Sequence, residues 1–215
     1  MTGVKILKVQ DFVRPQTVKA MLSLLGLTAY FHKHILNYAD VTRPLHKMLQ
    51  TGKKTTSGKN TTGKNRPLIW DDICIAAFAK IKSDIEQCPM LHFLKEDAPI
   101  YLNTNASDYG VGAHMFQIFR NVVYHVAFMS KSLSGAQLNW SVKEKECFAI
   151  VWALKRFEYL LRGRHFKLFT DHSNLLYLQS ESSQKVVRWR LFIQNYDFEL
   201  AYVKGSKNLQ FRCLV

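Results

Sequence analysis

Acidic residues are scarce in this chain of 215 residues. Asp and Glu together number 16 against 30 Lys and Arg, which gives a formal net charge of +14. A surface of this sign favours a polyanionic partner, and nucleic acid is the commonest one. The alternative, a basic composition that serves only solubility, stays open at this point.

Paired cysteines and long apolar runs are also missing. The four cysteines form no Cys-x-x-Cys pair, so a zinc site is not expected, and Cys147 lies in an apolar run typical of a core thiol. Nothing requires a disulfide, which fits a reducing cytosol or nucleus. No apolar run is long enough to span a membrane, and the first residues lack the pattern of a signal peptide. We therefore expect a cytoplasmic or nuclear protein with no membrane partner.

The apolar residues that are present, 47% of the chain, are enough for a real core. Residues 1–50 are expected to be helical, with apolar side chains at the helical spacing of Val18, Met21, Leu22 and Leu25. Gly26 is expected to end or bend that helix. A second helix is expected to begin near Asp40 and to hold Pro44 in its first turn.

Residues 51–66 contain neither an apolar residue nor an acid, which predicts a flexible basic linker. Contact with phosphates is one role for it, and a solvated insertion is the alternative that we favour. Residues 67–98 are expected to hold a connecting helix. Asp71 or Asp72 would cap its start, and the helix should stop before Pro89.

From residue 99 the pattern changes to a mixed α/β order. Strands are expected at 99–105, 111–119, 122–130, 165–170 and 197–203, and helices at 141–161, 172–178 and 183–195. Ser141 and Glu144 have the spacing of a capping box at the start of the long helix. This order predicts an α/β fold, a mixed five-stranded sheet flanked by helices.

Three places in this order could converge: the end of the first strand, the start of the long helix and the end of the fourth strand. They carry Asn105, Glu146 or Glu144, and Asp171, in that order. Carboxylates gathered in this way can hold two Mg²⁺ ions about 4 Å apart for phosphodiester hydrolysis. Alternatively, the two glutamates are ordinary first-turn acids and Asp171 only caps a helix. Periodicity does not choose between Glu144 and Glu146, because the helix that follows is apolar nearly all round.

Several stretches, which together cover almost all of the chain, resemble the C-terminal part of a gypsy-type LTR retrotransposon reverse transcriptase. The run "FVRPQTVKAMLSLLGLTAYFHKHILNYADVTRPLHKML" resembles the segment after the polymerase palm, and "IWDDICIAAFAKIKSDIEQCPML" resembles the connecting helix. The runs "NASDYGVGA", "WSVKEKECFAIVWALKRFEYLLRGRHFKLFTDH" and "RWRLFIQNYDFELAYVKGSKN" resemble the tethered RNase H domain. The resemblance implies a thumb-like segment over 1–50, the linker 51–66, a connection helix within 67–98 and an RNase H-like domain over 99–215.

The same resemblance assigns the catalytic positions. The helix glutamate of the family falls on Glu146 and its third acid on Asp171, which would be the metal ligands. The first acid is replaced by Asn105, a degraded ligand position, and the fourth by Arg212, a lost one. Asp108 lies in a turn where the family also has an acid, so it is not expected to substitute. The family uses Mg²⁺ or Mn²⁺, and this copy is expected to bind it weakly or not at all.

For function, the resemblance implies metal-dependent hydrolysis of the RNA strand of RNA:DNA hybrids, impaired here because two of four ligands are replaced. The family is also an RNA-directed DNA polymerase, a nucleotidyltransferase, but no Tyr-x-Asp-Asp motif occurs in this chain, so DNA synthesis alone is not expected. The implied partners are an RNA:DNA hybrid or other nucleic acid and the remainder of the polyprotein. The alternatives are a catalytically dead binding or interaction domain derived from a retroelement, and a relic product that does not fold.

Basic side chains of the C-terminal half are candidates for phosphate contact along a hybrid. The foremost are Lys131, Lys143, Arg188 and Arg190, followed by Arg162, Arg164 and Lys185. Each of them could instead be a solvated surface charge. Trp140 and Trp189 are expected to pack against helices rather than to stack on bases.

Overall fold

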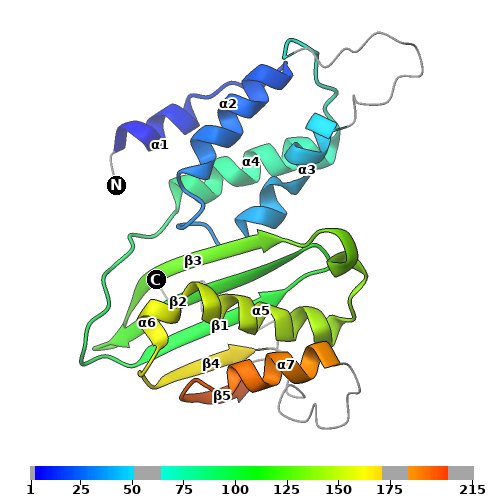
Figure 1. Ribbon diagram of the computed structural model, residues 1–215. Helices are drawn as coiled ribbons and strands as arrows, with labels where there is room; N and C mark the ends of the chain where they lie inside the picture. The colour runs from blue at the N-terminus through cyan, green and yellow to red at the C-terminus, as the bar shows by residue number, and fades with distance from the viewer. Residues whose placement is uncertain (1–2, 51–63, 171–183, 203–215) are drawn as a thin grey trace. The chain divides into compact units, whose positions relative to one another are not determined.

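The computed structural model describes residues 3–50, 64–170 and 184–202, and the chain divides into two compact units (Figure 1). The first unit is Met1–Met90 and the second is Leu91–Val215. None of the described helices is both long and apolar enough to cross a membrane.

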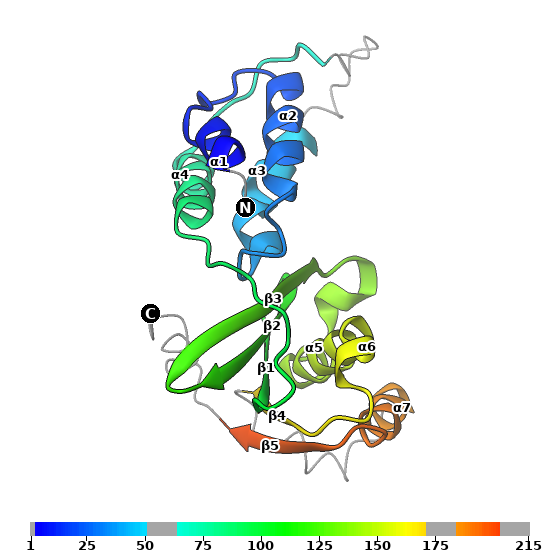
Figure 2. The ribbon, with the colours of Figure 1, turned by 90° about the vertical axis from the view of Figure 1, so that its left-hand side faces the viewer.

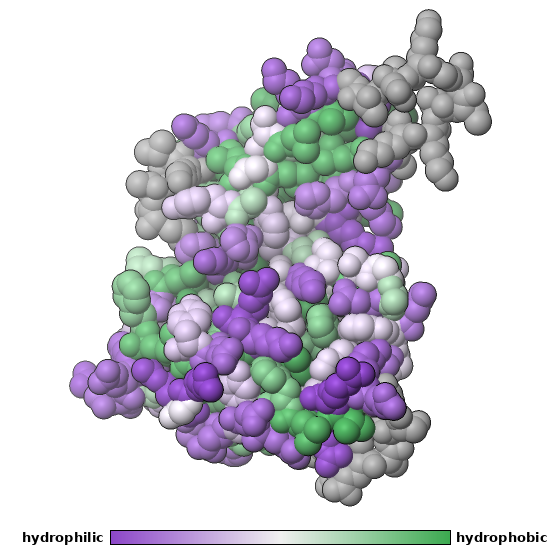
Figure 3. Space-filling view, in the orientation of Figure 1, coloured by the Kyte–Doolittle hydropathy of each residue, from purple (hydrophilic) through white to green (hydrophobic). Residues whose placement is uncertain are grey.

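The first unit is helical. Its elements are α1 (Gly3–Gln10), α2 (Val18–Ala29), α3 (Tyr38–Gln50) and α4 (Asp72–Glu86). As predicted, α4 is capped by Asp71 and ends before Pro89; the Asp71 side chain accepts a hydrogen bond from the Cys74 amide. Figure 3 shows apolar side chains gathered on one face of this unit between hydrophilic margins.

Two predictions for this unit are wrong. The helix does not end at Gly26: α2 continues to Ala29, and Gly26 does not have the positive φ at which glycine commonly ends a helix. Helix α3 begins at Tyr38, so Pro44 lies inside it rather than in its first turn. The earlier start follows from Asn37, whose φ of 55° turns the chain and whose carbonyl accepts from the Asp40 and Val41 amides.

The second unit is built on a five-stranded sheet. Its strands are β1 (Ile100–Ala106), β2 (Gly110–Phe119), β3 (Val122–Ser132), β4 (Phe166–Thr170) and β5 (Phe198–Tyr202). The order across the sheet is β3-β2-β1-β4-β5. The first three strands are antiparallel neighbours, whereas β4 is parallel to both β1 and β5. The mixed five-stranded sheet expected from the sequence is therefore confirmed.

The described helices of this unit are η1 (Gly135–Asn139), α5 (Val142–Arg156), α6 (Glu158–Leu161) and α7 (Gln184–Ile193). Figure 2 shows α5, α6 and α7 on the same side of the sheet. The single helix predicted over 141–161 is instead two helices that meet at Phe157. Phe157 is fully buried in the core, and its backbone leaves helical geometry at φ −102° and ψ 12°. The helix predicted over 172–178 lies outside the described residues.

The core between the sheet and α5 follows from strand alternation. Ile100 and Leu102 of β1 point to the same face, because successive side chains of a strand alternate. They pack with Ala149, Ala153 and other buried residues of α5. Helix α5 is buried over most of its length, which explains the nearly continuous apolar run of its sequence. This packing brings the start of α5 close to the end of β1, as the contacts below show.

Candidate functional site

The start of α5 carries a capping box, as the sequence predicted. The Glu144 amide donates to Ser141 Oγ at 3.3 Å, and the Ser141 amide donates to Glu144 Oε2 at 2.9 Å. The other oxygen of the Glu144 carboxylate lies 2.7 Å from Lys185 Nζ on α7. The bond from Lys185 and the one from Ser141 lower the pKa of Glu144. Glu144 therefore fixes the end of α5 and ties it to α7.

Glu146 has a different neighbour, the end of β1. Its side chain is buried, and Oε1 accepts a hydrogen bond from the Ala106 amide at 3.0 Å. Two residues along an α-helix correspond to a rotation of about 200°, so Glu144 and Glu146 point to opposite sides. The contacts that the two side chains make in the folded structure therefore distinguish the two candidate glutamates. The periodicity of the sequence did not predict these contacts. Glu146 is the acid at the place where the first strand ends.

Asn105 precedes Ala106 at that same strand end. It pairs with Gly112 across the antiparallel neighbour, and its side chain is exposed. Strand alternation directs the Asn105 side chain to the face opposite to those of Thr104 and Ala106. The backbone beside Asn105 therefore meets Glu146, while the amide side chain lies in solvent.

The C-terminal end of β4 lies at the same end of the sheet as the C-terminal end of β1. Strands β1 and β4 are parallel, with Asn103 opposite Phe169, and the Thr104 hydroxyl lies 3.5 Å from the Phe169 carbonyl oxygen. Thr170 is the last residue of β4, and Asp171 is the next residue in the sequence. Asp171 and Arg212 themselves lie outside the described residues.

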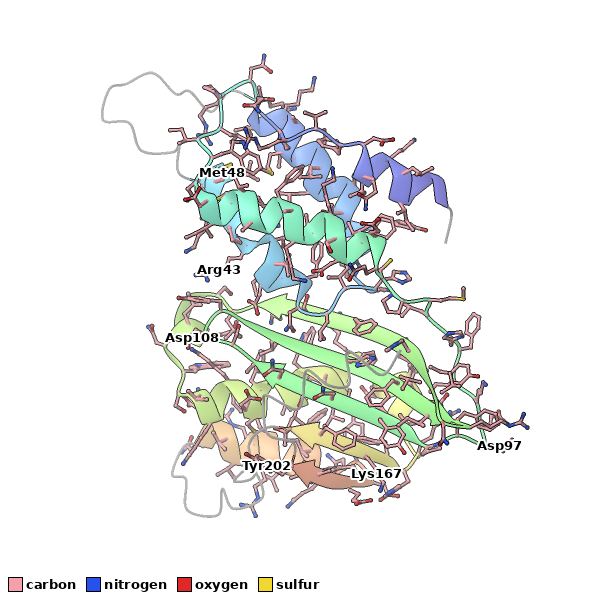
Figure 4. All side chains as sticks on the ribbon, turned by 180° about the vertical axis from the view of Figure 1, so that it is seen from behind. Arg43, Met48, Asp97, Asp108, Lys167 and Tyr202 are labelled. Carbon is pink, nitrogen blue, oxygen red and sulfur yellow. The ribbon has the colours of Figure 1, made fainter. Side chains whose placement is uncertain are left out.

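The turn between β1 and β2 is held from two directions. Ser107 Oγ accepts hydrogen bonds from the Tyr109 and Gly110 amides, which closes the turn. Lys145 of α5 is buried, and its Nζ lies 3.3 Å from the Asp108 carbonyl oxygen and 3.4 Å from Asp108 Oδ1. Figure 4 places Asp108 at one end of the sheet and Asp97 at the other. The sequence pattern indicates no role for Lys145, and its contact with the turn is visible only in the three-dimensional structure.

The described side chains do not by themselves fit a two-metal site. No three His, Cys, Asp or Glu side chains gather as a metal site within residues 3–50, 64–170 and 184–202. A site of that kind needs several carboxylates on one small patch. Glu146 supplies one, and the neutral Asn105 side chain adds no charge.

Lys131 is the candidate phosphate contact most directly related to this strand end. Val111 pairs with Ala106 on one side and with Lys131 on the other, so the three residues are in line across the sheet. Two strand spacings separate the backbones of Ala106 and Lys131 by about 10 Å. Lys131 Nζ lies 5.2 Å from the centre of the Phe148 ring of α5.

An aromatic cluster joins α5 and α7 beside Lys131. The ring centres of Trp140 and Trp189 are 5.3 Å apart, and Phe148 lies 5.2 Å from Trp140 and 5.7 Å from Trp189. The two tryptophans therefore pack between helices, as the sequence predicted. Lys185 Nζ lies 4.1 Å from the centre of the Trp140 ring, in addition to its pair with Glu144.

The other basic candidates lie on several elements. Lys143 is exposed in the first turn of α5, and Arg188 and Arg190 are on α7. Arg188 Nε donates to the Gln184 carbonyl oxygen of its own helix at 3.3 Å. Arg162 pairs with Glu158 at 3.6 Å on the surface, and Arg164 lies beside β4 at its amino end.

A hollow of about 630 Å³ lies in the first unit, between α3, the start of α4 and residues 66–71. Arg43 and Met48, both labelled in Figure 4, contribute to its wall together with Lys47, Arg66 and Ile73. Among the described residues, its lining combines apolar and basic side chains, with Asp71 as the one acid. This composition does not provide the carboxylates that metal-dependent hydrolysis needs.

Residues 95–196 match the family model described as the RNase H-like domain found in reverse transcriptase. Over 207 residues the chain is 33% identical to the retrovirus-related Pol polyprotein from transposon 297 of Drosophila melanogaster. It is also 33% identical over 208 residues to the transposon Tf2-3 polyprotein of Schizosaccharomyces pombe. These matches cover 95% and 94% of the chain but only 18% and 15% of the relatives, so the chain corresponds to a small part of each.

Solved structures share the fold. The foamy viral protease-reverse transcriptase in complex with an RNA/DNA hybrid has a TM-score of 0.70 at 18% identity, covering 95% of this chain and 27% of that one. A complex of the foamy viral protease-reverse transcriptase dRH with double-stranded DNA gives 0.72 at 17% identity, covering 95% and 35%. The chain therefore shares the fold of these structures, residues 95–196 are similar to the RNase H-like domain found in reverse transcriptase, and the chain as a whole is similar to a part of retrotransposon Pol polyproteins.

Proposed function

We propose that the chain is the C-terminal part of a gypsy-type LTR retrotransposon reverse transcriptase, with impaired hydrolysis of RNA in RNA:DNA hybrids. In this proposal residues 1–50 are the thumb-like segment, 51–66 the linker, 67–98 the connection and 99–215 the RNase H-like domain. The observation that carries it is the position of Glu146. This buried carboxylate of the second unit is bonded to the last amide of β1, beside Asn105.

We expect hydrolysis to be impaired because two of the implied metal-ligand positions lack a negative charge. Two divalent ions in a site of this kind activate water and stabilise the leaving oxygen, and several carboxylates must balance their charge. Asn105 offers a carbonyl oxygen without that charge, and Arg212 carries a cation to the position implied for the fourth acid. Two like unit charges 4 Å apart repel by about 4 kcal/mol at an effective dielectric constant of 20. Glu146 and Asp171 alone would hold Mg²⁺ or Mn²⁺ weakly.

The substrate class follows from homology and from charge. One solved relative of the same fold is a complex with an RNA/DNA hybrid, and the net charge of +14 suits a polyanion. Lys131, Lys143, Arg188 and Arg190 would contact phosphates, and of these Lys131 is in line with the end of β1. The remainder of the polyprotein is the second partner we propose.

The test is cleavage of an end-labelled RNA:DNA hybrid in Mg²⁺ and in Mn²⁺. We compare the wild-type chain with the double variant Asn105→Asp/Arg212→Asp, and use the same variant carrying Glu146→Gln as its control. We expect the double variant to cleave at least about 100-fold faster than wild type, since two ligand charges are worth several kcal/mol. Glu146→Gln should abolish that gain.

Two other outcomes would change the proposal. Cleavage by the wild type at the rate of the double variant would contradict impairment and make Asn105 a working ligand. Salt-dependent hybrid binding without cleavage by any variant would favour the alternative, a nucleic-acid-binding domain with no catalytic role.

A further inference from the structure

Three consecutive residues of α5 reach three different parts of the second unit. Glu144 bonds the helix start and Lys185, Lys145 contacts the turn after β1, and Glu146 contacts the last amide of β1. A helix turns by about 100° per residue, so neighbours in sequence fan out in this way. Two of these three contacts hold one short segment, Ala106 to Asp108, against the helix.

The position of Lys145 is unfavourable for a lysine on general grounds. Its side chain is only 7% exposed, and a buried ammonium group needs partners to offset the loss of water. It also lies near the positive end of the helix dipole, where an acid would be favoured. A methionine of similar length would avoid both costs. The contacts with the Asp108 carbonyl oxygen and carboxylate are therefore what the lysine provides.

These contacts have a geometric consequence. The Asp108 side chain is 75% exposed, and the hydrogen bonds of Ser107 that close the turn involve the Tyr109 and Gly110 amides rather than Asp108. Lys145 binds both the backbone carbonyl and the side chain of Asp108, which fixes the turn two residues after Ala106. Glu146, the next residue of α5, then meets the Ala106 amide at 3.0 Å.

We propose that Lys145 is a positioning residue, which holds the turn after β1 through Asp108 and thereby sets the place of the Glu146 carboxylate. In this arrangement Asp108 is the anchor of the turn. The catalytic part of the inference rests on the function proposed above, whereas the positional part rests only on the contacts of Lys145, Asp108, Ala106 and Glu146.

The first experiment follows the Ala106 amide by hydrogen exchange in the full-length chain. Lys145→Met keeps the length and removes the charge, and Lys145→Arg keeps the charge. Lys155→Met is the matched control, because it removes a lysine from the same helix about 15 Å away. We expect exchange at Ala106 to be about tenfold faster in Lys145→Met and Asp108→Ala, and within about threefold of wild type in Lys145→Arg and the control.

Two results would overturn the positional inference. One is an Ala106 amide that stays equally protected in Lys145→Met. The other is a loss of protection shared with the Leu102 amide in the interior of β1, because a general weakening of the fold is not positioning. Because the Asp108 side chain is 75% exposed, it stays hydrated when Lys145 is replaced, so Lys145→Met leaves no buried charge without a partner and the chain is expected to fold.

The second experiment adds Lys145→Met to the Asn105→Asp/Arg212→Asp background. We expect a lower kcat for hybrid cleavage with little change in KM, because Lys145 would act on the carboxylate and not on substrate binding. A change confined to KM would contradict the positioning role. If the background variant does not cleave, the proposed function fails, and the exchange experiment still decides whether Lys145 positions the turn.

Discussion

At the scale of single residues, the pair of histidines between β2 and β3 is the clearest pH-sensitive feature outside the candidate site. His114 Nε2 lies 2.9 Å from His125 Nδ1, and the His114 ring is stacked 4.1 Å from the centre of Phe128. Burial lowers the pKa of His114 well below its ordinary value of 6.5. Burial, and then the charge of His92, lowers the pKa of His125. Folding therefore favours the neutral form of both imidazoles.

A lowered histidine pKa makes stability depend on pH with a definite sign. Stability from this pair is fully present above pH 6.5, the ordinary pKa, and is lost as the pH falls from there toward the folded values. We expect the second unit to lose up to about 1.4 kcal/mol per pH unit for each such proton. Urea unfolding at pH 7.5, 6.5 and 5.5 measures this loss. The double variant His114→Phe/His125→Phe should show a flatter dependence, and an unchanged slope would rule the pair out as its source.

At the scale of elements, the caps of helices are where sequence and structure agree best. Asp71 Oδ1 accepts from the Cys74 amide at 2.7 Å, and the pKa of Asp71 is lowered first by a hydrogen bond from the Cys74 side chain and then by this amide bond. Asp72, the next residue, lies in the first helical turn of α4 and makes no cap. Both acids therefore lie near the positive end of the helix dipole, but Asp71 is the one whose side chain caps the helix.

Substitution of the cap separates these two effects. Asp71→Ala should destabilise the first unit by about 1 kcal/mol, the usual cost of losing an N-cap side chain. Asp72→Ala, the matched control, should cost only about 0.3–0.5 kcal/mol through the helix dipole. Urea unfolding followed by amide signals of α4 gives both values. Equal losses in the two variants would mean that charge, and not the cap bond, stabilises this helix end.

Features of single helices and strands that depend on local sequence could be predicted, whereas features that depend on distant contacts could not. Capping boxes, strand alternation and the stop before Pro89 are local signals, and they placed α4, β1 and the start of α5 correctly. The helix end expected at Gly26 was wrong because residue type alone does not show whether a glycine takes the positive φ at which helices commonly end. Periodicity could not separate Glu144 from Glu146, since both faces of α5 are covered. Lys145 was missed because its partner, Asp108, is 37 residues away.

At the scale of the whole molecule, the apolar clusters respect the boundary between the two units. The clusters around Leu24 and Ile81 contain only residues of Met1–Met90. Those around Leu168 and Val186 contain only residues of Leu91–Val215. Each unit therefore has its own core among the described residues, which is the physical condition for folding as a separate unit.

Because each unit has its own core, a cavity made in one core by mutation should destabilise that unit and not the other. Leu24 and Leu168 are both fully buried, one in each unit, and truncating a buried leucine costs about 2–5 kcal/mol. We expect Leu24→Ala to lower the urea midpoint of the first unit alone and Leu168→Ala that of the second alone. Amide signals assigned to α2 and to β4 report the two units in one titration, and each variant is the control for the other. If both midpoints moved together in either variant, the units would unfold as one cooperative body, and loss of the helical unit would then also remove the strand end that holds Glu146.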